Sequence, residues 1–361
     1  MGRFTRLLVL LLTIITMAAC RQEEGEKERM VNLQKIQDNP EAQLRNLNAA
    51  IANARRDGSL YARRAVVLLR KGELNKALQD ADEAIRLTKS EPLTLFVKAQ
   101  VLRAMGRRDE ALPLALQAER NAYQSASLYV LLGELYLQQR KYEQATYYIG
   151  KAQELAPGNE FAYYYRGRIQ EATGDTSSAV HNYKLALKQM PQFMEAQREL
   201  TGILVARKDF EGAKPYLQSA ARLAPDDALL LYYQGVLYQV AQKPDSAQLY
   251  FAHAVALNDT LQEAHYFIGL RQYAKGDGEG ALAHLLKAGK KYKDQPRYLA
   301  ALGASYERAG QPFQALATYQ RLVQVDPRYT YAYQAIARIK YKLQRGITTD
   351  STVVTPVTIE E

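Results

Sequence analysis

The sequence predicts an all-α protein in which a unit of two helices repeats along the chain as a solenoid. The main observation is an alanine that recurs with a period of 34, eight times without an insertion or deletion. These alanines are Ala77, Ala111, Ala145, Ala179, Ala213, Ala247, Ala281 and Ala315. A second alanine follows seven positions after seven of them, and a proline follows twelve positions after four of them. Such a unit buries its apolar face only by stacking on its neighbours.

The composition supports a folded repeat protein rather than a disordered one. Of the 361 residues, 47% are apolar and 24% are charged, which is ordinary for folded chains. The formal net charge is +10, and the chain has 26 tyrosines, no tryptophan and one cysteine. A single cysteine excludes an intramolecular disulfide and a zinc site built from several cysteines.

Residues 1–19 are typical of an export signal rather than of a folded element. Arg3 and Arg6 precede an apolar run, 7–17, that is too short to cross a bilayer comfortably, and two alanines follow it. Cys20 comes directly after these alanines. This arrangement resembles the signal of bacterial lipoproteins, and the resemblance implies that residues 1–19 are removed and that Cys20 is lipidated. An ordinary signal peptide followed by a chance cysteine and an uncleaved membrane anchor remain alternatives.

The residues after Cys20 bear on location. Residue 21 is arginine, not aspartate, and by resemblance to lipoprotein sorting in Gram-negative bacteria this favours the outer membrane. We expect the lipid-anchored chain on its periplasmic face. The acidic cluster in 23–26 resembles signals for export to the cell surface, so surface exposure stays open. Residues 20–39 have few apolar side chains and are predicted to be a tether.

Residues 58–329 are predicted to form eight units of this period, each with a first helix, A, and a second helix, B. The recurring alanines lie at position 20 of each unit, where Gly58 is position 1 of the first. Small residues at positions 8, 20 and 27 let the two helices approach closely, and larger residues at positions 4, 7, 11 and 24 fill the space beside them. These residues resemble the tetratricopeptide repeat (TPR). The resemblance implies a right-handed superhelical solenoid of helix-turn-helix repeats.

Two prolines and the two ends depart from the regular unit. Pro113 and Pro215 lie at position 22, which is inside helix B unless that helix starts late. Residues 40–57 have the apolar spacing of a helix B and are predicted to be an N-terminal capping helix. Residues 330–345 match a helix A without its helix B, as a C-terminal capping helix does. Residues 346–361 have no helical pattern and are predicted to be a disordered tail.

Catalytic motifs are not recognisable in this sequence. The four histidines show no HExxH-like spacing, and no GxxxxGK[ST] loop is present. The glycine-rich stretch "KGDGEG" at 275–280 falls between two predicted helices, with no strand before it, and is interpreted as a turn. We therefore expect no enzymatic activity, no cofactor and no metal site.

A partner would bind to the inner groove of the solenoid. By resemblance to the TPR family, positions 2, 5, 9 and 12 of helix A face this groove. Aromatic and arginine side chains, which dominate recognition surfaces, occupy several of these positions. The predicted partner-binding residues are Phe96, Phe161, Tyr164, Arg168, Arg198, Tyr232, Tyr266 and Tyr273. Packing between helices is the alternative role for these rings.

The positive charge is concentrated near the C-terminus. Residues 287–345 hold twelve Lys or Arg and three Asp or Glu. This end is predicted to contact anionic lipid, with a general role in solubility as the alternative. Nucleic acid is not expected as a partner, because the chain carries an export signal.

Together these features predict a non-catalytic, lipid-anchored scaffold or adaptor of the bacterial cell envelope that binds a protein or peptide. The design resembles TPR lipoproteins of the NlpI and PilF types. A lipoprotein that binds carbohydrate or peptidoglycan on its groove aromatics is the main alternative, and a component of a secretion or gliding machine is a third.

Overall fold

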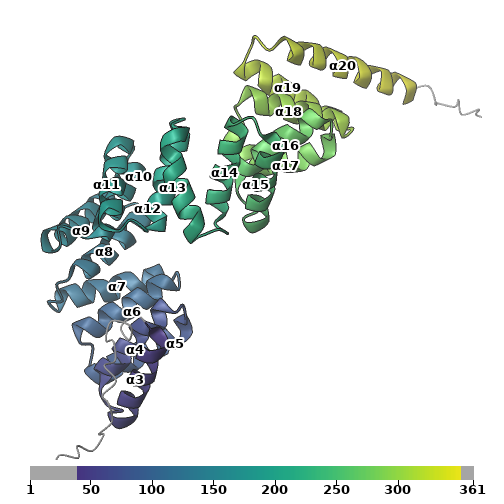
Figure 1. The fold of residues 1–361 in the computed structure, drawn as a ribbon. Helices are drawn as coiled ribbons and strands as arrows, with labels where there is room; N and C mark the ends of the chain where they lie inside the picture. The colour runs from purple at the N-terminus through teal and green to yellow at the C-terminus, as the bar shows by residue number, and fades with distance from the viewer. Residues whose placement is uncertain (1–38, 351–361) are drawn as a thin grey trace, which may run out of the picture. The chain divides into compact units, whose positions relative to one another are not determined.

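The computed structural model describes residues 39–350, and within this range every regular element is a helix (Figure 1). The helices are α3 (Pro40–Asn53), α4 (Gly58–Arg70), α5 (Leu74–Thr88), α6 (Pro92–Ala104), α7 (Arg108–Arg120), α8 (Ala126–Gln138), α9 (Tyr142–Leu155), α10 (Glu160–Ala172), α11 (Thr176–Gln189), α12 (Met194–Ala206), α13 (Phe210–Leu223), α14 (Ala228–Val240), α15 (Pro244–Leu257), α16 (Gln262–Lys275), α17 (Gly278–Tyr292), α18 (Pro296–Arg308), α19 (Pro312–Val325) and α20 (Thr330–Asp350). The predicted signal peptide, Cys20 and nearly all of the predicted tether lie outside the described residues.

Consecutive helices pack as hairpins, so the predicted all-α repeat fold is confirmed. Helix A begins at Gly58 in the first pair, and each later helix A begins one full period after the one before it. The turn between the two helices of a pair has a similar backbone conformation in every repeat. Position 15 has a positive φ in every pair, and it is a glycine in five pairs, such as Gly72 (φ 76°), and another residue in three, such as Lys208 (φ 61°).

The recurring small residues are explained by how close the paired helices lie. A Cβ atom on Gly133 of α8 would lie 2.5 Å from the Ile149 side chain of α9. A Cβ atom on Gly167 of α10 would lie 2.7 Å from the ring of Tyr183 of α11. Both separations are shorter than carbon atoms tolerate. In these pairs position 8 must therefore be small, because the large residue at position 24 of the partner helix occupies the space; in the first two pairs position 24 is itself alanine, and position 8 is alanine rather than glycine.

The two internal prolines do not delay the start of their helices. α7 begins at Arg108 and contains Pro113, and α13 begins at Phe210 and contains Pro215. Each proline is the sixth residue of its helix, so it removes one backbone hydrogen bond near the helix start. Both helices continue past the proline, and Ala111 and Ala213, two residues before it, are fully buried.

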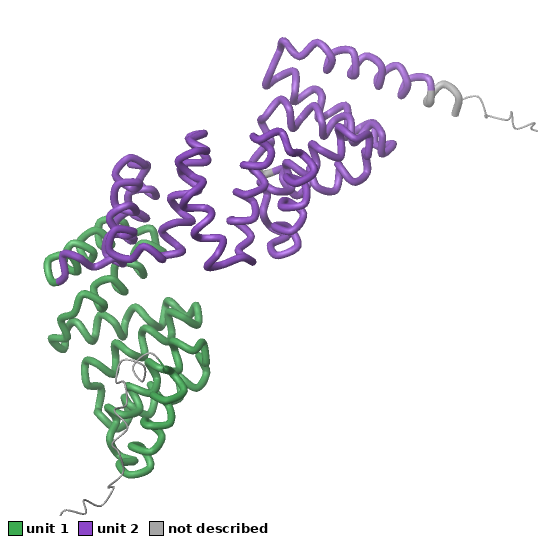
Figure 2. The backbone as a smooth tube through the Cα atoms, viewed as in Figure 1, with its two compact units in different colours: residues 1–155 green, residues 156–361 purple. Residues whose placement is uncertain are grey.

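The chain divides into two compact units, residues 1–155 and 156–361 (Figure 2). The described part of the first unit contains α3 to α9, and that of the second contains α10 to α20. In both, the alanines at position 20 are almost or completely inaccessible to solvent, so the core runs along the line where helices A and B meet.

The two end helices differ in how well they match expectation. α3 begins at a capped N-terminus, because the side chain of Asn39 accepts a hydrogen bond from the Ala42 N–H (3.1 Å) and Pro40 occupies the first turn. α20 continues to Asp350, beyond the predicted capping helix 330–345, and residues 351–361 of the predicted tail lie outside the described residues. Gly346 weakens a helix by only about 1 kcal/mol, and no proline occurs before Pro356 to end it. None of the described helices is both long and apolar enough to cross a membrane.

Candidate functional site

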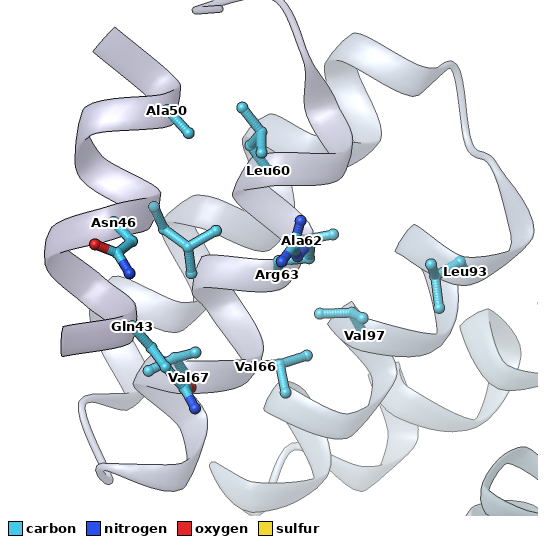
Figure 3. A pocket seen from close by; sticks show the side chains of 11 residues that line it. Gln43, Asn46, Ala50, Leu60, Ala62, Arg63, Val66, Val67, Leu93 and Val97 are labelled. Atoms are coloured by element: carbon cyan, nitrogen blue, oxygen red, sulfur yellow. The ribbon is translucent and has the colours of Figure 1, made fainter. Parts of the chain in front are cut away.

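A cavity lies in the first compact unit, between α3, α4 and α6 (Figure 3). Its volume is about 620 Å³, within the range of ligand-binding pockets. It is lined by Gln43, Asn46, Leu47 and Ala50 of α3, by Leu60, Ala62, Arg63, Val66 and Val67 of α4, and by Leu93 and Val97 of α6. The first helices of two successive pairs and the helix before them thus form its walls.

The walls of the cavity are mainly aliphatic. Leu47 and Val97 are buried, whereas Leu60 and Val66 are half-buried and Leu93 keeps 39% of its surface exposed. An exposed leucine is common on its own, but here it continues an apolar surface into a cavity. This arrangement can accept aliphatic side chains from another segment, since each buried leucine- or valine-sized group contributes about 1.5–3 kcal/mol.

Arg63 adds a positive charge to the cavity. It makes no hydrogen bond or ion pair with another residue in the described range 39–350, although its charge helps to lower the pKa of Asp57, after the larger effect of hydrogen bonds from Ser59. The next residue, Arg64, behaves differently: it forms two hydrogen bonds to Asp80, of 2.6 and 2.7 Å. Arg63 is therefore free to bind a carboxylate, the group that a guanidinium binds best.

Three of the predicted groove rings, one each on α6, α10 and α16, are in the core. Phe96, Tyr164 and Tyr266 are only 6%, 5% and 8% exposed. The ring of Phe96 lies 5.3 Å from that of Tyr123, Tyr164 lies 4.9 Å from Phe193, and Tyr266 stacks on Tyr292 at 3.9 Å. Burial also raises the pKa of the Tyr164 hydroxyl. These three rings pack against neighbouring elements, which differs from the exposed binding role we expected of them.

Both predicted arginines form ion pairs with carboxylates inside the second unit. Arg168 donates a hydrogen bond to the Tyr164 hydroxyl (3.0 Å) and lies 3.7 Å from the carboxylate of Glu199. Arg198 lies 3.3 Å from the same carboxylate and binds Asp227 at 2.8 Å. The structure thus brings Tyr164, Arg168 and Arg198 together around Glu199, as a network that links α10 to α12 and α14.

The remaining predicted residues are separate from this network. Phe161 is 41% exposed and packs edge-on against the ring of Phe193. Tyr232 is half-buried against Phe251, and Tyr273 lies under the guanidinium of Arg308 at 5.4 Å. The predicted stripe is therefore not one continuous aromatic surface.

Comparison with known proteins identifies the repeat. Models of the tetratricopeptide repeat match residues 96–160, 162–228 and 301–328. The chain contains tetratricopeptide repeats. Bovine BBSome complex member BBS4 is 23% identical over 250 residues, which are 69% of this chain and 48% of that protein. The type IV pilus assembly protein PilF of Pseudomonas aeruginosa is 25% identical over 188 residues, 47% of this chain and 75% of that protein.

Solved TPR structures agree with the fold. In the crystal structure of the APC/C hetero-tetramer Cut9-Hcn1, one chain superposes with a TM-score of 0.59 and 16% identity, covering 83% of this chain and 58% of that one. Identity this low supports the fold alone. The chain spans about half the length of BBS4, so the whole of that protein's role does not carry over to this chain.

The TPR positions show why the cavity escaped sequence reasoning. Ala62 and Val66 are positions 5 and 9 of the first repeat, and Leu93 is position 2 of the second. The groove residues were predicted from these same positions, but only aromatic and arginine side chains were considered as binding residues. A search for neighbouring repeats that carry aliphatic residues at the same positions would have found this cavity.

Two of the four histidines face each other in the second unit. The Nδ1 atoms of His265 and His284 lie 2.7 Å apart, and His265 Nε2 lies 2.9 Å from the Asp259 carbonyl oxygen. Burial, followed by the charges of His265 and Lys287, lowers the pKa of His284. No group of three or more His, Cys, Asp or Glu side chains in the described residues is arranged to hold a metal ion.

Proposed function

We propose that this chain is a non-catalytic TPR adaptor that binds a protein partner in the cavity between α3, α4 and α6. One observation carries the proposal: an aliphatic cavity of about 620 Å³ beside an arginine, Arg63, that has no ion pair in the described residues. The matching ligand is a peptide segment with two or more aliphatic side chains and a carboxylate within reach of that arginine.

The relatives support a role in assembly. BBS4 is named as a member of a complex, and PilF is named as a type IV pilus assembly protein. A TPR array presents such surfaces without itself carrying out chemistry, and the function depends on the site rather than the fold. We extend to this chain only the general role of holding other proteins together.

We further propose that the adaptor works in the bacterial cell envelope, anchored by a lipid on Cys20 to the periplasmic face of the outer membrane. The support is the sequence of residues 1–21. In sequence, only the predicted tether separates Cys20 from Pro40, so the cavity belongs to the repeats nearest the anchor. A Cys20→Ser variant should leave the membrane fraction, and its persistence there would refute the lipid anchor.

The basic C-terminal end is proposed as a second membrane contact. Lys340, Tyr341 and Lys342 are exposed on α20, and cationic and tyrosine side chains suit the headgroup region of anionic membranes. Binding to phosphatidylglycerol vesicles should weaken as salt increases and should weaken in a Lys340→Gln/Lys342→Gln variant. Binding that is insensitive to both would refute this contact.

The glycan alternative has less support than the peptide cavity. It needs several exposed aromatic platforms in the groove, but Phe161 alone of the predicted rings is exposed, at 41%, and Phe96, Tyr164 and Tyr266 are buried. Sugars bind proteins largely by stacking on an accessible aromatic face, and these rings offer none. We therefore place peptide binding first.

Partner binding can be tested by photo-crosslinking in the bacterium that produces the protein. A photoreactive phenylalanine analogue at Val66 would report on the cavity, and the same analogue at Leu249, which is 70% exposed on α15 of the second unit, is the matched control. We expect a discrete crosslinked protein from position 66 only. Arg63→Ala should reduce that product, and the purified partner should bind the Arg63→Ala variant about five- to tenfold more weakly, or ~1–1.4 kcal/mol. Equal products from both positions would refute the proposal.

A further inference from the structure

The phase of the repeats continues back through α3. α3 begins at Pro40, one full period before α5 begins at Leu74. Ala50 likewise lies one period before Ala84, the fully buried position 27 of the first repeat. α3 is thus a helix B, and its own helix A is not among the described residues.

The cavity occupies the place where that helix A would pack. In complete repeats, position 8 of helix A lies against position 24 of helix B, as Gly133 lies against Ile149. In α3, positions 20, 24 and 27 are Gln43, Leu47 and Ala50, and all three line the cavity (Figure 3). The side of α3 that corresponds to the helix A-facing side of other B helices therefore lines the cavity.

The chain contains a segment of suitable length and pattern in front of α3. In every complete pair, helix A begins at the same offset before helix B, as Gly58 precedes Leu74. The same offset before Pro40 falls on Glu24, and counted from there, Met30 and Leu33 fall at positions 7 and 10. Position 7 is buried in four of the eight complete repeats and position 10 in six, for example Leu132 and Leu135 at 0% and 1% exposed. Two apolar side chains thus fall where a helix A needs them.

The same register provides a partner for Arg63. Position 9 of one helix A lies beside position 6 of the next, as shown by Arg168 and Glu199, whose charged groups are 3.7 Å apart. Arg63 is position 6, and the matching position 9 in the segment is Asn32. The side-chain oxygen of Asn32 can accept a hydrogen bond from the guanidinium.

We propose that residues 24–37 of this chain dock in the cavity as the first helix of an additional N-terminal repeat, and that a partner must displace them. This rests on the proposed function only in sharing the cavity. Because the segment is covalently joined to α3, its effective concentration is on the order of millimolar, so even weak docking keeps the cavity mostly filled. Partner affinity is then lowered in proportion to the fraction of molecules with an open cavity.

The inference can be tested with one reporter cysteine in the full chain. Cys20 is the only cysteine, so a Cys20→Ser/Val66→Cys chain has a single thiol, at the cavity. We expect Met30→Ser/Leu33→Ser to speed maleimide labelling of this thiol about tenfold. The matched control is Lys35→Ser/Ile36→Ser at positions 12 and 13, since position 13 is exposed in complete repeats, as in Val240. The control should label at the parent rate.

Two further measurements separate docking from general loosening. A reporter cysteine at Leu249 should label equally fast in all of these variants. A synthetic peptide of residues 24–38 should slow labelling again in the Met30→Ser/Leu33→Ser chain, whereas the same peptide with both serines should not. In addition, Asn32→Asp should slow labelling of the otherwise unchanged reporter chain, because it recreates the pair formed by Arg168 and Glu199.

Equal labelling of the parent and the Met30→Ser/Leu33→Ser chain would overturn the inference, as would a failure of the peptide to protect Val66→Cys. Neither result would affect photo-crosslinking of a partner at Val66. Conversely, protection by residues 24–37 without any crosslinked partner would refute the proposed function and leave this inference standing.

Discussion

Replacing Gly167 by alanine should destabilise the second compact unit, although alanine favours a helix. The new Cβ would lie 2.7 Å from Tyr183 Cε1 and 2.9 Å from Cδ1. The Tyr183 ring is completely buried, and its hydroxyl donates a hydrogen bond of 2.7 Å to Glu171, so it cannot move aside without losing that bond. Alanine gains about 1 kcal/mol in helix propensity, while overpacking costs about 1–3 kcal/mol and the strained hydrogen bond about 1 kcal/mol more. We expect a net loss of about 1–3 kcal/mol.

The matched control is Gly150→Ala in α9, where the new Cβ would have no neighbour within 4 Å. It should gain helix propensity alone and stabilise its repeat by up to about 1 kcal/mol. Urea unfolding followed by circular dichroism measures both variants. In a Tyr183→Ala background, Gly167→Ala should cost much less, because alanine at position 8 is found opposite alanine at position 24, as in Ala65 and Ala81. If Gly167→Ala were as stabilising as Gly150→Ala, the close-approach explanation for the glycines at position 8 would be refuted.

Three further predictions concern the turns, an ion pair and a histidine. Lys208→Gly should raise the melting temperature, because glycine adopts the left-handed backbone conformation of this position without the strain that lysine has, which gains up to about 1 kcal/mol. An unchanged or lower melting temperature would contradict this. Arg64→Ala should cost about 1–3 kcal/mol in chemical denaturation by leaving the buried Asp80 unpaired, and Arg64→Ala/Asp80→Ala should cost less. The folded state lowers the pKa of His284, so stability should fall as pH drops below about 6.5, and melting of His284→Gln should show a smaller pH dependence.

The repeat phase could be predicted from sequence because close packing fixes it. Where the two helices of a pair lie this close, position 8 can hold only a small side chain, and it is glycine in five repeats, alanine in two and threonine, Thr201, in one. That constraint acts on the residue itself, so it is visible in the sequence. The end of α20 could not be predicted in this way, since residues 346–350 carry no recurring packing requirement.

The groove residues were harder to predict because a position on a helix does not determine whether its side chain is covered. Tyr164 is at the same position as Ala62, position 5, yet its long ring reaches Phe193 at the start of the next repeat and is covered by it. Ala62 is too short to reach such a neighbour and leaves space, which becomes part of the cavity. A large side chain at a groove position can thus fill the groove, whereas a small one opens it.

Ion pairs between the first helices of neighbouring repeats follow a constant spacing in the sequence, and this spacing helps to identify an arginine without a partner. Three ion pairs join neighbouring first helices at one constant spacing in the sequence: Arg103 with Glu134, Arg168 with Glu199, and Glu307 with Arg338. Applied to Arg63, the same spacing leads forward to Thr94, a buried hydroxyl that donates to the Glu91 carbonyl oxygen, and not to an acid. Arg63 therefore lacks the carboxylate that its counterparts have. Where the spacing supplies an acid, the arginine joins repeats together; where it does not, the arginine is left to bind a group from outside the described helices.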